Sequence, residues 1–283
     1  MKRISYIPSG RTETSYTDTV LTEGIEEGGE LEVRTANLLI RGERCIVDGD
    51  IKCDGNVIID GAIIYGTIEA EGKVIIKNDA IIAGRITSNQ RSIYVKNHTI
   101  LSGGCEQPMM LCSHYGNLLI GRNVTIKGVE EDKQILLQGR RIIAPGLTIE
   151  KGVYAYAYIF AEFDGISGGY FQLINSDIKL GKKDSPGLVA NFCDSESIIV
   201  SWKGNVIIGH ISNSQISANN EVLAVRIENS TISAKHVGVE LIGKGSQVNA
   251  ETVVIANGIG MCELIADSVL LCGKEIGDSH LKT

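Results

Sequence analysis

Apolar residues in this chain fall in short β-branched runs that return at a nearly fixed distance. Val57-Ile58-Ile59 returns as Val74-Ile75-Ile76, and Gly, Asn or Asp flank both runs. Gly49-Asp50-Ile51 likewise returns as Gly66-Thr67-Ile68 and as Gly84-Arg85-Ile86. β-Branched runs between turn residues predict strands. A short, repeated period predicts stacked units that share one core.

The pattern therefore predicts an all-β fold, a single-stranded parallel β-helix solenoid with turns of about 17–19 residues. Each strand is expected to pair with its equivalent one turn on. No segment sustains apolar residues at helical spacing. Glycine at the boundaries is expected to supply the positive φ that tight corners need.

Residues 1–36 are the least repeat-like part of the chain. A Ser/Thr-rich segment is followed by five glutamates between Glu23 and Glu32. This composition predicts a flexible or loosely attached N-terminal arm. The alternative is a solvated terminus that only caps the first turn. Residues 37–283 are predicted to form a continuous β-helix.

The repeat continues with insertions. VIIKNDAIIAG (74–84) returns one turn on as IYVKNHTILSG (93–103), and LLIGRNVTIKG (118–128) follows after a longer interval. The segment Cys105–His114 supplies the extra length, so it is predicted to leave the coil as a loop.

Residues 153–174 hold seven of the fourteen aromatic residues. Aromatic and small residues alternate there with period two, which places them on opposite faces of a sheet. If the small residues face the interior, the aromatic row points outward as a candidate interface; its members are Tyr154, Tyr156, Tyr158 and Phe160. Two alternatives are an aromatic stack inside a widened coil and a face covered by a neighbouring loop.

A second signature marks the last third of the chain, where Asn-Ser or Asp-Ser pairs suit tight corners. The pairs are Asn175-Ser176, Asn213-Ser214, Asn229-Ser230 and Asp267-Ser268. The first and second pairs are as far apart as the third and fourth, which predicts two turns of about 19 residues between equivalent corners. Stacked corners of this kind are expected to form polar ladders.

Composition narrows the class further. The net charge of −7 argues against a nucleic-acid partner, which would need a basic surface. No run of eighteen apolar residues or secretory leader is evident, so a cytoplasmic location is expected. The N-terminal arm is a candidate contact for a membrane surface or cell-wall machinery. Seven cysteines at irregular spacing fit reduced core residues.

The repeat resembles the bactofilins, bacterial polymer-forming cytoskeletal proteins. The resemblance is best over residues 47–86 and extends loosely to about 128, through GDI, GNVIIDG, GTI, GKVII and AIIAGRI. It implies a right-handed β-helix that assembles end to end into filaments without nucleotide, attached to membrane by an N-terminal tail. The coil then divides into a bactofilin-like part, about 37–150, and an extended part, about 151–275. The chain departs from the family in its greater length and in lacking an apolar anchor.

Exposed strand edges at the ends of such a coil are templates for pairing with another copy. The sequence therefore predicts a non-enzymatic structural protein whose main partner is itself. No catalytic residue, cofactor or metal ligand is expected, and Asp48, Asp54 and Asp60 occupy turn positions. No sustained six-residue apolar repeat accompanies His98 or His114, and Gly209-His210 is only part of a Gly-His-Gly motif. Cys105, Cys112 and His114 lack the spacing of a zinc site. The alternative is a β-helix that binds or cleaves carbohydrate.

Overall fold

The computed structural model describes residues 1–103, 108–127, 134–173, 186–202, 204–272, 275–276 and 280–282. Every regular element in this part of the chain is a β-strand. The chain divides into two compact units. The N-terminal unit holds Met1–Leu147 and Gly152–Tyr154, and the C-terminal unit holds Thr148–Lys151 and Ala155–Thr283. The prediction of an all-β fold is confirmed.

The N-terminal unit is built from short strands. They are β1 (Lys2–Ile7), β2 (Thr12–Ser15), β3 (Thr19–Ile25), β4 (Glu30–Val33), β5 (Leu38–Arg41), β6 (Ile46–Val47), β7 (Asp50–Cys53), β8 (Val57–Asp60), β9 (Ile63–Ile64), β10 (Thr67–Ala70), β11 (Val74–Lys77), β12 (Ile81–Ile82), β13 (Arg85–Ser88), β14 (Ile93–Val95), β15 (Ile100–Ser102), β16 (Met109–Ser113), β17 (Leu118–Ile120) and β18 (Thr125–Lys127). Residues of two longer strands, β19 (Ile135–Glu150) and β20 (Val153–Ser167), occur in both units.

The C-terminal unit continues with longer strands. They are β21 (Tyr170–Leu173), β22 (Pro186–Asp194), β23 (Ile198–Ser201), β24 (Asn205–Ser212), β25 (Gln215–Ala218), β26 (Glu221–Glu228), β27 (Thr231–Ile242), β28 (Gln247–Ile259), β29 (Glu263–Leu271), β30 (Glu275–Ile276) and β31 (His280–Lys282).

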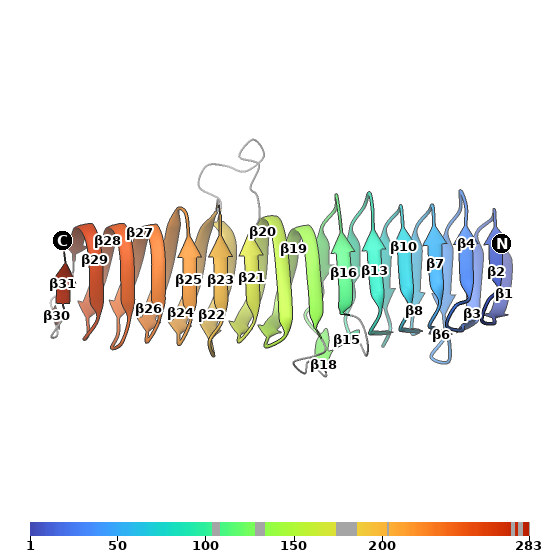
Figure 1. Cartoon of the computed structure of the whole chain (residues 1–283), viewed down its shortest axis with the longest axis horizontal. Coiled ribbons are helices and arrows are strands. Elements are labelled where there is room, and N and C mark those ends of the chain that lie inside the picture. The colour runs from blue at the N-terminus through green and yellow to red at the C-terminus, as the bar shows by residue number, and fades with distance from the viewer. Residues whose placement is uncertain are drawn as a thin grey trace. The chain divides into compact units, whose positions relative to one another are not determined.

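In the N-terminal unit each strand pairs in parallel with its equivalent one turn on (Figure 1). Ile51 pairs with Ile68, and Ile68 pairs in turn with Ile86. Each turn carries two or three short strands separated by corners. The predicted parallel solenoid and its turn length are confirmed for these turns.

From β24 onward, the turns of the C-terminal unit are shorter than predicted, whereas Leu188 pairs with Val206 at the predicted spacing. Val206 pairs with Val222, Val222 with Val237, and Val237 with Val253. β27 and β28 are 12 and 13 residues long and bend without a separate turn segment. Because a corner built into a strand is shorter than a separate turn, the coil closes in about 15–16 residues instead of 17–19.

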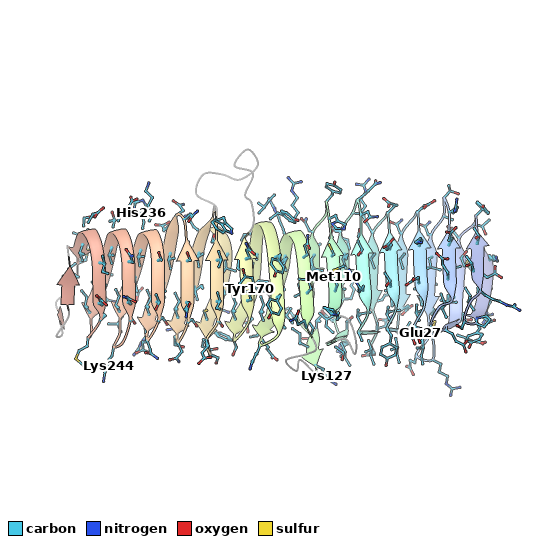
Figure 2. All side chains as sticks on the ribbon, in the orientation of Figure 1. Glu27, Met110, Lys127, Tyr170, His236 and Lys244 are labelled. Carbon is cyan, nitrogen blue, oxygen red and sulfur yellow. The ribbon has the colours of Figure 1, made fainter. Side chains whose placement is uncertain are left out.

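The core of each unit is the narrow interior of its coil. Within the repeated Val-Ile-Ile runs, Ile59 and Ile76 are fully buried, while Ile58 and Ile75 lie half-buried on the outer surface. Period-two alternation on a strand produces this division. Each buried isoleucine contributes roughly 2–3 kcal/mol of hydrophobic free energy, so stability accumulates turn by turn. Charged side chains such as Glu27 and Lys244 project from the turns (Figure 2).

The N-terminal segment differs from the predicted loose arm. Residues 2–33 form β1 to β4, with β1 paired to β3 and β2 paired to β4, which in turn pairs with β7. The reason lies in the inward positions. Leu31 and Val33 are fully buried, and Ser15 is buried at the equivalent place one turn earlier. The outward glutamates that suggested disorder occupy the solvent face of ordered strands.

The predicted loop at Cys105–His114 is also wrong in part. Met109–Ser113 form β16, which pairs with β13 on one side and β19 on the other. Met109 and Leu111 are fully buried, so this segment carries core residues. Residues 104–107, which include Cys105, lie outside the described residues. The extra length of this turn therefore falls between β15 and β16.

Polar corners stack in the C-terminal unit as predicted for two of the four pairs. The Asn229 side-chain amide donates to Asn213 Oδ1 at 2.6 Å, and the Ser214 backbone N–H donates to Ser230 Oγ at 3.2 Å. Asp267-Ser268 is not an equivalent corner, because Ser268 pairs with Thr252 and belongs to another column. The distance from Asn229 to Asp267 along the chain therefore equals two predicted turns only by coincidence. Asn175-Ser176 lies outside the described residues.

Candidate interaction surfaces

The first turn of the N-terminal unit presents one unpaired sheet edge. Within the described residues β1 pairs only with β3, and β2 pairs only with β4. The Lys2 backbone N–H donates to Asp18 O at 2.8 Å, toward the next turn. Since backbone groups of successive strand residues point to opposite sides, the N–H and C=O of Arg3 point along the coil axis, away from the next turn. This edge is suited to pairing with another strand.

One side chain lies across part of this edge. Lys2 Nζ donates to Thr14 O at 3.2 Å and pairs with Glu13 Oε2 at 3.1 Å. Both carboxylate and ammonium are partly exposed, so this ion pair contributes less than about 1 kcal/mol. The contact uses a side chain that can move aside, and it leaves Arg3 uncovered.

The aromatic row lies on β20, as the sequence analysis placed it. Ala155 and Ala157 are fully buried in the interior, whereas Tyr154, Tyr156 and Tyr158 are half-buried on the outer surface. The predicted separation of small and aromatic faces is present. The Tyr156 and Tyr170 ring centroids lie 5.9 Å apart in a tilted arrangement, so the outward aromatic rings also contact one another. Phe160 is half-buried as well. Its role and that of the tyrosines as an interface stays a prediction.

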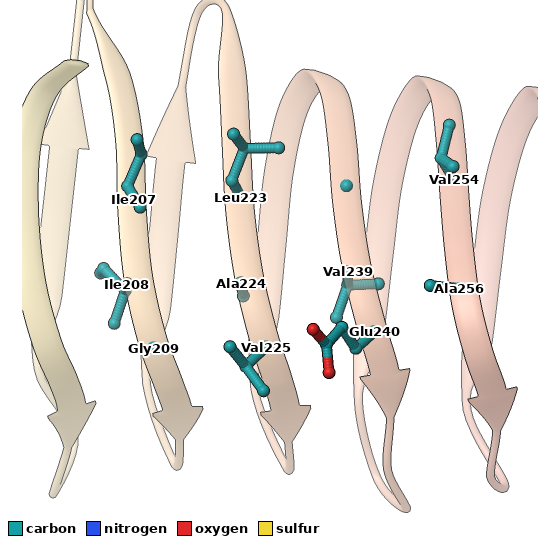
Figure 3. Close-up of a pocket in the computed structure, with 11 residues that line it drawn as sticks. Ile207, Ile208, Gly209, Leu223, Ala224, Val225, Val239, Glu240, Val254 and Ala256 are labelled. Atoms are coloured by element: carbon teal, nitrogen blue, oxygen red, sulfur yellow. The ribbon is translucent and has the colours of Figure 1, made fainter.

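An apolar strip crosses one face of the C-terminal unit (Figure 3). Ile207, Leu223 and Val254 occupy matched outward positions, with Gly238 in register between the last two. The register extends to Val189 at one end and Leu270 at the other, and Leu270 is 58% exposed. We call these six residues the apolar strip.

The strip borders a hollow of about 390 Å³, and among the described residues Glu240 is the only charged one that lines it. Sequence reasoning missed it because runs such as Val206-Ile207-Ile208 look fully buried. The available signal was that both alternating positions of several equivalent strands are apolar. Exposed apolar surface of this kind marks a contact surface.

The stacked Asn corners border a second, polar hollow of about 790 Å³. Asn213 and Asn229 both have positive φ, 46° and 44°, which asparagine tolerates better than most residues. Gln215 and Thr231 line the same hollow from β25 and β27. It therefore presents amides and hydroxyls together with the Glu196 carboxylate.

The carboxylates considered for catalysis serve the turns. Asp54 Oδ2 accepts the Thr35 backbone N–H at 3.1 Å, one turn away. Asp60 pairs with Lys77 Nζ at 3.3 Å and accepts from Asn78 Nδ2 at 2.5 Å. Asp48 is exposed. These contacts give Asp54 and Asp60 structural roles between neighbouring turns. The hollow that Asp54 borders has neither Asp48 nor Asp60 in its lining.

Asp60 gives a pH prediction. Burial alone would raise the pKa of its carboxyl, but hydrogen bonds from Asn78 and Lys77 and the charges of Lys77 and Arg41 lower it below 3.8. A lowered folded-state pKa means that the charged form stabilises the fold above the unfolded pKa of about 4, and that this contribution disappears as the pH falls through the folded pKa. Asp60→Asn should lower the free energy of unfolding at pH 7 by less than about 1 kcal/mol.

The measurement is urea denaturation of both proteins from pH 7 downward. The difference should shrink below about pH 4. Asp48→Asn is the control, since Asp48 makes no side-chain hydrogen bond or ion pair among the described residues. A difference that stays constant across the whole range would contradict the assignment.

The cysteines and histidines form no site in the described structure. No group of three metal-binding side chains is present among the described residues. Cys112 Sγ lies 3.7 Å from His114 Nδ1, but burial raises the pKa of the Cys112 thiol to about 11 and keeps it protonated. Burial likewise raises the pKa of Cys45 to about 11. Such thiols are poor nucleophiles and metal ligands. His98 and His210 are exposed.

The described residues also contain no helix with the length and apolar character of a membrane-spanning segment. What the two units share is a parallel β-solenoid whose distinctive surfaces are a sheet edge, an aromatic row and two hollows. These features define a structural scaffold of the β-solenoid class.

Comparison with known proteins gives a family match for one segment of the chain. Residues 13–106 match the family model described as "Bactofilin: Polymer-forming cytoskeletal". The resemblance is thereby confirmed for this N-terminal segment, and the match begins within the first 36 residues, in agreement with their place in the coil. No curated protein and no solved structure matches the chain.

Proposed function

We propose that this protein is a non-enzymatic structural protein that assembles end to end into filaments, with the edge of β1 and β2 as one contact surface. The observation that carries the proposal is the outward-facing backbone of Arg3, in a segment where the edge is otherwise lightly covered. Exposed edges are templates for another strand. The polymer-forming character of the family matched by residues 13–106 supports it.

Each added copy would extend the parallel ladder that already runs through the coil. The geometry needs no nucleotide, because backbone hydrogen bonds and continuity of the apolar interior supply the association. In this proposal the bactofilin-like part, about 37–150 together with the strands before it, carries the assembly. The extended part, about 151–275, adds side surfaces such as the aromatic row and the apolar strip. A cytoplasmic location, and contact with membrane surface or cell-wall machinery, belong to the same proposal.

Arg3→Pro tests this proposal against Arg3→Ala. Proline removes the N–H of Arg3 that points away from the next turn and places a ring at the edge. The hydrogen bond from the Lys2 N–H to Asp18 O stays in place. Alanine removes the same side chain but keeps the N–H. Electron microscopy and sedimentation should show filaments for wild type and Arg3→Ala, and a shift to short or single species for Arg3→Pro.

A second pair of variants, in the neighbouring strand, controls for local misfolding caused by Arg3→Pro. Thr12 lies at the same edge in β2, so Thr12→Pro and Thr12→Ala should repeat the contrast. Circular dichroism at matched concentration verifies that each variant keeps its β-structure. Filaments of normal length in both proline variants, or a wild type that stays monomeric at high concentration, would overturn the proposal.

A further inference from the structure

One sheet face of the C-terminal unit is covered by exposed, uncharged polar side chains. We call it the neutral face; it consists of Gln215, Ser217, Thr231, Ser233, Gln247 and Asn249. The residues come from β25, β27 and β28 and are in register: Gln215 pairs with Thr231 and Thr231 with Gln247. Successive turns therefore repeat the same kind of group about every 4.8 Å.

The hydrogen-bonding capacity of this face is largely unused. Among the described residues only Gln247 donates from its side chain to another side chain, Glu263 Oε2 at 3.2 Å. Amides and hydroxyls both donate and accept. Each of the remaining five side chains thus offers both a donor and an acceptor, in a regular array.

The corresponding face of the N-terminal unit has a different chemistry. There the outward residues of β7 and β10 include Asp50, Lys52 and Glu69, and Lys52 forms an ion pair with Glu30 at 3.1 Å. A coil of this type therefore accommodates charges at these positions. The six outward positions of the neutral face carry none, in a chain with a net charge of −7. The charged pair Lys235 and Glu251 follows on β27 and β28, with Lys235 Nζ 3.9 Å from Glu251 Oε2.

Two further features lie beside the neutral face. The polar hollow of about 790 Å³ opens along its edge, and Gln215 and Thr231 belong to both. On β23, which pairs with β25, Ile198 is 43% exposed, and Trp202 just past the strand is 51% exposed. Ile199 and Ser201 are buried, whereas the side chains of Ile198 and Trp202 are exposed at the two ends of this segment.

The aromatic surface continues one strand further. Tyr170 on β21 pairs with Ile198 and is visible on the outer side of its strand (Figure 2). Tyr156 of the aromatic row contacts Tyr170. The neutral array therefore has an aromatic border made by Trp202 and Tyr170.

We propose that the neutral face and its aromatic border bind an extended, uncharged polysaccharide strand. Sugar hydroxyls both donate and accept, as the array does, and their repetition along a polymer matches repetition along the coil. The apolar C–H face of a sugar ring packs on an aromatic ring such as the Trp202 indole. This binding function is separate from the proposed self-assembly.

The charge of the face selects the polymer class. A neutral strand brings no formal charge that must lose water, whereas an anionic polymer would find no cation among the six residues of the neutral face, and Lys235 beside it already pairs with Glu251. Glu196, which lines the polar hollow, would repel such a polymer further. A protein strand is less suited, because the array offers no apolar pockets for alternate side chains.

Retention of the full-length protein on microcrystalline cellulose, chitin and insoluble mannan tests the proposal. Wild type should bind at least one of these matrices, and a soluble neutral glucan should compete where polygalacturonate does not. Trp202→Ala should weaken retention at least tenfold. Ser233→Lys, which places a charge at the centre of the array, should do the same.

Glu69→Lys is the matched control, since it introduces the same side chain at an exposed outward position of β10. It should leave retention unchanged, and filament length should not change in any of these variants. The proposal is overturned if wild type binds none of the three matrices, or if Ser233→Lys and Glu69→Lys behave alike. It is equally overturned if Ser233→Lys changes only the oligomeric state, because the face would then contact a second copy.

Discussion

Replacing Gly66 with alanine should lower the free energy of unfolding of the N-terminal unit by about 3 kcal/mol or more. A Cβ atom at this position would lie 2.1 Å from the Gly49 carbonyl oxygen and 2.7 Å from the Asp48 carbonyl carbon. Both are backbone atoms of the preceding turn, so no side chain can move aside. The added methyl would force two stacked turns apart and weaken the ladder between them.

The clash is repeated through the stack. A Cβ on Gly84 would in turn lie 2.1 Å from the Gly66 carbonyl oxygen. Gly238→Ala is the control: the only atom that its Cβ approaches closely is Leu223 Cδ2 at 2.7 Å, at the end of a flexible side chain. That variant should change stability by less than about 1 kcal/mol. Urea denaturation followed by circular dichroism measures both, and equal midpoints for Gly66→Ala and wild type would refute the packing argument.

The glycines show how far the repeat could be interpreted from sequence. Their spacing gave the correct turn length in the N-terminal unit, because equivalent glycines must recur wherever turns stack. The expected reason, a positive φ, is wrong for Gly49, Gly66 and Gly84, which are absent from the positive-φ residues. They are required by close approach of neighbouring backbones. Sequence spacing cannot separate these two demands, since both exclude a side chain.

Other predictions were wrong for a different reason. In the C-terminal unit the corners at Asn213 and Asn229 were recognised, and their separation of 16 residues already carried the shorter turn length. The equal distances from Asn175 to Asn213 and from Asn229 to Asp267 suggested longer turns instead, and β27 and β28, which bend within one strand, show no further corner to correct this. The N-terminal strands were misjudged because only alternate positions, such as Leu31 and Val33, carry the core.

The surfaces depended on the register. Alternation along β20 was enough to separate its aromatic and small faces. The apolar strip and the neutral face, in contrast, appear only when outward residues of several strands are aligned, as with Ile207 and Leu223 or Gln215 and Thr231. A one-residue error in turn length moves every outward residue inward. Without the true spacing of the C-terminal turns, neither surface could be assembled from the sequence.

Phe171→Ala should destabilise the C-terminal unit by about 3–5 kcal/mol. Phe171 is fully buried inside a narrow coil, and its ring contacts Phe163 edge to face with centroids 5.9 Å apart. Removing the ring leaves a cavity that closed, parallel turns cannot collapse around, and it also removes the aromatic contact. Phe171→Leu keeps most of the volume and should lose clearly less, about 1 kcal/mol.

The strands in which Phe171→Ala speeds hydrogen exchange test the solenoid architecture more sharply than the total loss of stability does. In a stack where each turn contacts only its neighbours, loss at β21 should loosen nearby turns and leave distant ones protected. Amide hydrogen exchange of Phe171→Ala should therefore speed up in β21 and β23, while β8 and β11 exchange as in wild type. Leu270→Ala, a truncation at a largely exposed outward site, should change neither set of strands. Uniformly faster exchange throughout the chain of Phe171→Ala would mean that the two units unfold as one cooperative body, contrary to this nearest-neighbour account.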